Sequence, residues 1–122
     1  MSNISQEKII ETIVRALDSK RGEEIKAVKI RDLTILADYF IIAGASSTTQ
    51  TKALADAVEY ELKKLGIEPV RTEGYSSANW IILDYTDIVV HVFYKETRDL
   101  YKLEKLWSDG EQVDISEYVK PD

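Results

Sequence analysis

Two runs of β-branched and aromatic residues meet at a polar turn in the stretch Trp80-Ile81-Ile82-Leu83-Asp84-Tyr85-Thr86-Asp87-Ile88-Val89-Val90-His91-Val92-Phe93-Tyr94. Such runs on either side of a short polar segment are typical of a β-hairpin. The hairpin is too apolar for both of its faces to contact water, so other elements of the chain must cover at least one of them. The stretch therefore predicts a sheet inside a layered domain. It leaves open whether the second face is also covered or is kept for a partner.

The pairing across this hairpin follows from the position of its turn. If Tyr85 and Thr86 are the two central residues, Asp84 lies opposite Asp87 and Trp80 lies opposite His91. Because side chains alternate between the faces of a strand, one face is a plain core face, with Ile81, Leu83, Ile88, Val90, Val92 and Tyr94. The other, named here the tryptophan face, carries Trp80, Ile82, Asp84, Val89, His91 and Phe93. Its indole, carboxylate and imidazole predict either a covering helix that binds them or a recognition surface.

The composition is that of one globular domain of 122 residues, 31% of them charged and 44% hydrophobic. No apolar run approaches the ~20 residues of a membrane span, and no signal-peptide core is found, so we expect a cytoplasmic protein without membrane contact. The absence of cysteine excludes disulfides and thiolate zinc sites. The 16 basic residues are dispersed among 22 acidic ones, for a net charge of -6. This balance argues against sequence-specific nucleic-acid binding and suits a basic partner such as a ribosomal protein.

Helices and strands are expected to alternate along the rest of the chain. The apolar spacing predicts helices over residues 5–20, 47–66 and 97–107, and strands over residues 25–31, 38–44 and 69–73. With the hairpin, this order predicts an α/β fold with a single mixed β-sheet of about five strands and flanking helices. The strand after the second helix should lie parallel to the strand before it, since crossover helices favour that arrangement. Residues 111–122 are expected to form a frayed tail or a short docking helix.

The clearest helix start follows Gly44. The segment Ser47-Thr48-Thr49-Gln50 fits a capping box, in which the serine hydroxyl accepts from the Gln50 amide while the glutamine side chain reaches back. At the other end, Gly66 suits the left-handed cap and Pro69 prevents continuation. The loop before this helix could instead hold an anion with free amides. It lacks the lysine and the glycine spacing of a phosphate-binding loop, and capping accounts for its serines.

Catalytic and metal-binding chemistry has little support in the sequence. His91 is the only histidine, and without cysteine it lacks the cluster that zinc or a catalytic triad requires. The strand-glycine-serine-helix start is similar to that of nucleotidyltransferases, which need an Asp-x-Asp pair on a following strand to hold magnesium. Glu73, Asp84 and Asp87 are the only plausible substitutes, and the two aspartates are explained as turn formers. We therefore expect no enzyme activity, no metal and no cofactor.

Five sequence features occur together over about residues 5–108. They are Asp38-Tyr39-Phe40-Ile41-Ile42; Gly44 and Ser46 with Gln50 and Ala53; Glu73-Gly74; Trp80, Asp84 and Asp87 with Val90-His91-Val92-Phe93; and Arg98, Tyr101, Leu103, Glu104, Leu106 and Trp107. In order and spacing, the set resembles the ribosomal silencing factor family, also called Iojap-like. The resemblance implies a fold like that of nucleotidyltransferases without their catalytic carboxylates. It also implies a silencing-factor domain over residues 1–108 and an acidic C-terminal tail over residues 109–122.

The function implied by this resemblance is not enzymatic. Members bind the large ribosomal subunit through its fourteenth protein (L-fourteen), block association with the small subunit and repress translation when nutrients are limiting. They tend to form homodimers. Organellar relatives act in large-subunit assembly, which is the alternative function alongside a metal-dependent nucleotidyltransferase-like enzyme.

The resemblance also assigns partner-binding residues, which are Glu73, Trp80, Ile82, Asp84, His91 and Phe93. Trp80 is expected to anchor the partner, with Ile82 and Phe93 completing an apolar patch. The two acids should meet basic side chains at the rim. His91 should orient the indole or donate to a partner carbonyl. A second-choice surface consists of Tyr101 and Glu104, whereas Trp107 is expected in the core.

Overall fold

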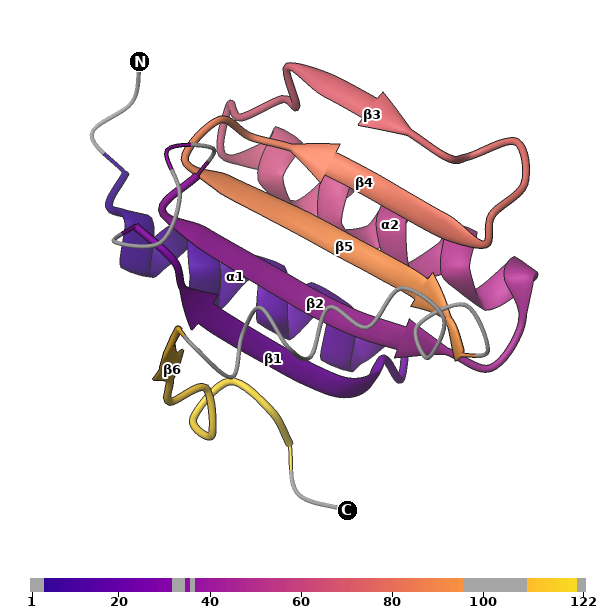
Figure 1. Ribbon diagram of the computed structural model, residues 1–122, viewed down its shortest axis with the longest axis horizontal. Helices are drawn as coiled ribbons and strands as arrows, with labels where there is room; N and C mark the ends of the chain where they lie inside the picture. Colours follow the sequence, from indigo (N-terminus) through magenta and orange to yellow (C-terminus); the bar gives the residue numbers. More distant parts are fainter. Residues whose placement is uncertain (1–3, 32–34, 36, 96–109, 121–122) are drawn as a thin grey trace.

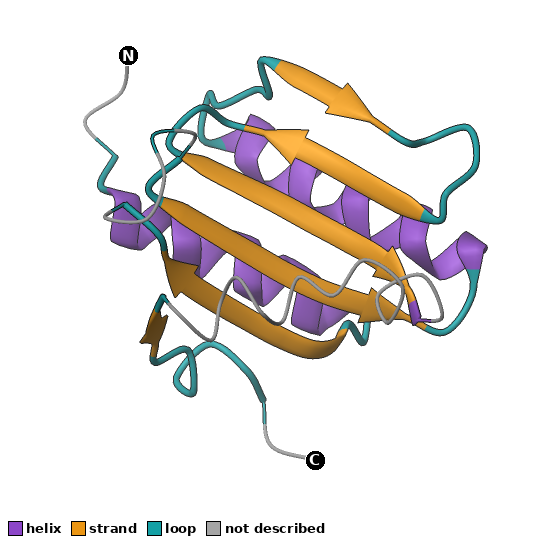
Figure 2. Cartoon of the chain, in the orientation of Figure 1, coloured by secondary structure: helices purple, strands orange, loops and turns teal. Residues whose placement is uncertain are grey.

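The fold was analysed on a computed structural model that describes residues 4–31, 35, 37–95 and 110–120 (Figure 1). Over these residues the chain forms one six-stranded mixed sheet with two helices on one side (Figure 2), which confirms the α/β class. The elements are α1 (Gln6–Ser19), β1 (Glu23–Lys29), β2 (Tyr39–Ala45), α2 (Thr48–Lys64), β3 (Arg71–Glu73), β4 (Trp80–Asp84), β5 (Ile88–Tyr94) and β6 (Glu111–Val113). The helix expected over residues 97–107 lies outside the described residues.

The strand order is β3-β4-β5-β2-β1-β6. Neighbours pair antiparallel except β2 and β5, which are parallel. We expected the strand after α2 to lie parallel to β2. The strand β3 does run in the direction of β2, but β4 and β5 lie between them. The parallel neighbour of β2 is therefore β5 and not β3. The chain first forms the antiparallel pair of β3 and β4 before it reaches β5.

Side-chain and glycine caps define both ends of α2. The Ser47 hydroxyl accepts a hydrogen bond from the Gln50 amide at 3.0 Å, as the capping box predicts. At the C-terminal end, Gly66 has a φ of 80°, and the amides of Gly66 and Ile67 donate to the carbonyls of Lys63 and Leu62. These two bonds make a Schellman motif, so the expected glycine cap is confirmed.

The core lies between the sheet and the helices. Five hairpin residues expected on the core face are at most 2% exposed and pack in one cluster with residues of α1, α2 and β2; they are Ile81, Leu83, Ile88, Val90 and Val92. A second apolar cluster lies on the opposite side of the sheet and includes Phe40, Ile42 and Phe93, with Trp80 and Val89 packed against it. The hairpin thus contributes to two cores, one on each face.

The hairpin register differs from the prediction by two residues. Trp80 lies opposite Phe93, and Asp84 lies opposite Val89, because the turn is centred on Thr86 and Asp87. Thr86 has a φ of 74°, and its amide donates to the Asp84 carboxylate at 2.8 Å. That bond stabilises a turn one residue later than the one we assumed. A shift of two residues leaves every side chain on its expected face.

The described part of the C-terminal segment joins the sheet. We expected residues 111–122 to be a frayed tail or a short helix, but Glu111–Val113 form β6, paired with β1. Beyond this strand, Ile115, Tyr118 and Val119 pack against the main core. The Lys120 amide donates to the Asp18 carboxylate at 3.0 Å. The apolar residues of this acidic segment therefore serve to attach it to α1 and β1.

Candidate partner-binding site

The tryptophan face is assembled from neighbouring strands. Cross-strand pairing places Ile82 opposite His91 and Glu73 opposite Ile82. The parallel pairing with β2 adds Ile42 beside His91. Among the residues that the structure describes, α1 and α2 lie on the other side of the sheet (Figure 1). No described helix therefore covers the indole. A covering helix was one of the two possibilities that the sequence left open.

A hydrogen bond fixes the orientation of the Trp80 side chain. Its indole N–H donates to Nδ1 of His91 at 3.1 Å. The indole also stacks on Phe93, with ring centroids 5.1 Å apart and an angle of 22° between the planes. Phe40 packs against His91, with the centroids of the two rings 4.5 Å apart. The expected role of His91 in orienting the indole is present in the structure.

Burial keeps the His91 side chain neutral. The residue is only 6% exposed, and desolvation lowers its pKa from 6.5 to about 4. Because Nδ1 accepts from the indole, the single proton of the neutral ring is on Nε2. That nitrogen is buried and has no hydrogen-bond partner among the described residues. Burial of this N–H group has a cost, which the contacts with Trp80, Phe40 and Phe93 offset.

We expect the stability of the fold to depend on the charge of His91. The unfolded chain takes up a proton near pH 6.5, whereas the folded chain does so only near pH 4. The contribution of neutral His91 to the free energy of unfolding is therefore complete above about pH 6.5. It is lost as the pH falls toward 4, by roughly 1–2 kcal/mol between pH 7 and pH 5. Urea unfolding of the native chain and of His91→Phe across this range measures it. The carboxylates titrate in both proteins, so parallel curves would contradict the prediction.

The charged rim of the face contains an arginine that the sequence reasoning missed. Arg71 on β3 lies 3.0 Å from the Glu73 carboxylate and 3.5 Å from that of Asp84. The two acids expected to meet basic groups of a partner thus already share a cation of this chain. The signal was available in sequence, since Arg71 stands two residues before Glu73 in a strand. Recognising it required the β3–β4 register, which the hairpin alone does not give.

The other predicted site residues differ in their accessibility. Phe93 is fully buried, as is most of His91, so neither presents a surface to a partner in this structure. We correct the role of Phe93 to support of the indole by stacking, whereas His91 keeps the orienting role expected for it. Trp80, Ile82 and Asp84 are partly exposed and Glu73 is exposed, so contact of these four with a partner stays a prediction. The second-choice residues Tyr101 and Glu104 lie outside the described residues.

The loop before α2 has its polar groups engaged within the chain. The Ser46 amide and hydroxyl both donate to Oε1 of Gln50 at 2.7 Å. Nε2 of the same glutamine donates to the carbonyls of Lys20 and Arg21. Gln50 therefore connects this loop to the α1–β1 turn. The arrangement supports the structural explanation of the serines over an anion site.

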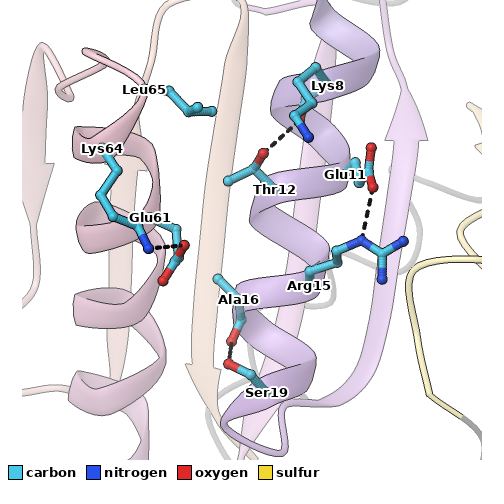
Figure 3. A pocket seen from close by; sticks show the side chains of 9 residues that line it. All are labelled: Lys8, Glu11, Thr12, Arg15, Ala16, Ser19, Glu61, Lys64 and Leu65. Atoms are coloured by element: carbon cyan, nitrogen blue, oxygen red, sulfur yellow. Dashed lines mark hydrogen bonds and ion pairs between the residues drawn. The ribbon is translucent and has the colours of Figure 1, made fainter.

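Two further features lie away from the tryptophan face. A groove of about 390 Å³ lies between α1 and α2, and its acids Glu11 and Glu61 are paired with Arg15 and Lys64 (Figure 3). In the described part of the chain, no three side chains of His, Cys, Asp or Glu gather as a metal site would require. Within the same residues, no helix has the length and apolarity needed to span a membrane.

The fold defines the class as a small α/β protein built on one open, mixed sheet. A family model described as "Ribosomal silencing factor during starvation" matches residues 3–122. The ribosomal silencing factor of Halalkalibacterium halodurans is 37% identical over 112 residues, covering 92% of this chain and 96% of that protein. A crystal structure of a protein from Chromobacterium violaceum matches with a TM-score of 0.83 at 34% identity and covers 91% of each chain. The chain belongs to the ribosomal silencing factor family.

More distant relatives extend the family to organelles. The mouse protein named "Mitochondrial assembly of ribosomal large subunit protein 1" is 29% identical over 102 residues, which are 81% of this chain and 45% of that protein. Iojap proteins of plants also match. The resemblance stated from the sequence is thus confirmed. The family is named for the silencing of ribosomes, which places the chain among regulators of translation.

Proposed function

We propose that this chain binds the large ribosomal subunit through L-fourteen, using the accessible part of the tryptophan face. The bound chain then occupies the side of the large subunit that the small subunit must approach, and so represses translation when nutrients are limiting. The observation that carries the proposal is the Trp80 indole, held by His91 and Phe93 at a sheet face where no described helix lies. A large aromatic side chain fixed in advance is a typical anchor of a protein interface.

The rim of the face supports recognition of a basic partner. Glu73 and Asp84 flank Arg71, so the rim alternates in charge and would set the register of a partner strand or loop. The whole chain carries a net charge of -6. At long range this charge would attract a basic ribosomal protein and raise the association rate. Apolar contact at Trp80 and Ile82 would then supply most of the affinity.

The silencing mechanism makes a specific prediction about which particles the chain binds. Sedimentation with isolated large subunits should carry the protein into the subunit fraction, whereas assembled ribosomes should leave it at the top of the gradient. The reason is steric, because the small subunit covers the proposed binding surface in the assembled particle. Equal binding to both particles would overturn the steric mechanism.

The name of the mouse relative favours a second candidate, a role in large-subunit assembly. An assembly factor would sediment with incomplete large-subunit precursors, and its removal would cause those precursors to accumulate. A silencing factor would bind mature subunits and leave their assembly unchanged when removed.

The proposal further gives the chain a cytoplasmic location and a second copy of itself as a partner.

A further inference from the structure

The connection between β3 and β4, residues 74–79, leads from the helix side of the sheet to the tryptophan face (Figure 1). Near its start, Tyr75 packs against the main core, which lies between the sheet and the helices. Directly after its end, Trp80 packs against the second cluster, on the opposite side of the sheet. The shape of this connection therefore affects how the indole is placed.

The hydroxyl of Tyr75 attaches the connection to α2. It lies 2.5 Å from Oε2 of Glu59 and 3.2 Å from Oδ1 of Asp56, and its single proton can be donated to only one carboxylate at a time. Hydrogen bonds from a hydroxyl to a carboxylate are stronger than those between neutral groups. Over the residues that the structure describes, neither carboxylate has an ion-pair partner, so no cation there competes with the hydroxyl. Burial and the neighbouring Glu59 carboxylate raise the pKa of Tyr75, which keeps the donor proton in place.

The backbone of the connection is tightly constrained. Gly74 and Ala78 have positive φ angles of 90° and 58°, and the Ala78 amide donates to the Gly74 carbonyl at 2.8 Å. A left-handed conformation is unfavourable for alanine and persists where the surroundings impose it. Gly74 also lies so close to the backbone of Trp80 that a Cβ would not fit. A displacement of Tyr75 would therefore reach Trp80 through the adjacent Gly74.

We propose that Tyr75 is a positioning residue for Trp80, and that its hydrogen bond to α2 holds residues 74–79 in the shape that presents the indole to a partner. The contacts form a continuous path from Glu59 through Tyr75 and Gly74 to Trp80. Without the hydroxyl, the strained connection takes up other shapes, and the indole is in place for a smaller fraction of the time. The apparent affinity for a partner falls with that fraction. The inference rests on the proposed function, because it concerns the same anchoring side chain.

Tyr75→Phe removes the hydroxyl and keeps the ring, and the chain offers a matched control for it. The Tyr85 hydroxyl is buried and has no hydrogen-bond partner within the described ranges. Its ring packs against the same core, but it follows the other end of β4. Removal of a buried hydroxyl that makes no hydrogen bond costs little or is stabilising. Tyr85→Phe should therefore leave both the fold and the Trp80 side chain unchanged.

The indole N–H of Trp80 gives a readout that needs no ribosome. Because this group donates to His91, its exchange with solvent deuterium, followed by NMR, measures how often the indole leaves its place. The chain has two tryptophans, and the spectrum of Trp80→Phe identifies the signal. Tyr75→Phe should speed the exchange at least roughly tenfold, as for a lost hydrogen bond to a charged group, whereas Tyr85→Phe should not. An unchanged rate, or an increase no larger than the loss of global stability in urea, would overturn the proposal.

Binding to isolated large subunits provides the second measurement. Tyr75→Phe should raise the Kd roughly twofold to fivefold, as the fraction of chains with the indole in place falls. Asp56→Ala combined with Glu59→Ala removes the two acceptors and should have the same effect, and adding Tyr75→Phe to this pair should raise the Kd no further. An equal added effect in both backgrounds would show that the hydroxyl does not act through the carboxylates, and would overturn the proposal. If Trp80→Ala itself leaves binding unchanged, the proposed binding surface is wrong, and the exchange measurement still decides whether Tyr75 positions the indole.

Discussion

Replacing Trp80 by alanine is expected to lower the affinity for the large ribosomal subunit by at least ~2 kcal/mol, about 30-fold in Kd, as for an interface anchor. The structure gives the reason. The indole is held by a hydrogen bond to His91 and by stacking on Phe93, so little rotational freedom is lost when a partner binds it. Alanine removes the aromatic surface that the partner would cover. Pulldown of isolated large subunits, and of L-fourteen alone, measures the loss.

A matched aromatic control separates binding from stability. Tyr60 is 63% exposed and lies on α2, on the opposite side of the sheet from the tryptophan face, so Tyr60→Ala should leave binding unchanged. Thermal melts recorded beside the pulldown show how much of each effect is unfolding. If Trp80→Ala lowers the melting temperature while the folded fraction binds normally, Trp80 is a core residue. The binding surface would then have to be sought elsewhere on the chain.

The two faces of the hairpin could be predicted from the sequence because their assignment depends only on parity. The turn lies one residue later than expected, which moves every cross-strand pair by two positions. Side chains alternate with a period of two, so Trp80, Ile82 and Asp84 still share a face with His91 and Phe93. The neighbours of each residue changed, but its face did not.

The accessibility of the site could not be predicted in the same way. Alternation says which side of the sheet Phe93 faces but not what lies over it, and the structure shows it fully buried. The role of Arg71 was also hidden, because it depends on β3 returning beside β4 instead of beside β2. The connection between β3 and β4 contains Gly74, which lies close to the backbone of Trp80.

Replacing Gly74 by alanine is expected to destabilise the fold by about 3 kcal/mol or more. Gly74 has a φ of 90°, a conformation that is strained for a residue with a Cβ. A Cβ at this position would also lie 1.8 Å from the Trp80 carbonyl oxygen and 3.2 Å from the Cα of Ile81. These are backbone atoms of β4, so a rotamer change cannot relieve the contact and the strand itself must move. Urea unfolding at pH 7 measures the cost.

Gly66 provides the control, because it separates the backbone strain from the clash. It has a similar φ of 80°, but a Cβ there would meet no atom within 4 Å. Gly66→Ala should therefore cost only the strain of the left-handed conformation, about 1 kcal/mol. The excess cost of Gly74→Ala measures the displacement of β4, and since β4 begins at Trp80, the same variant should also weaken binding to the large subunit. Equal costs for the two substitutions would mean that β4 accommodates the Cβ freely. The close approach of Gly74 to Trp80 would then have no part in positioning the indole.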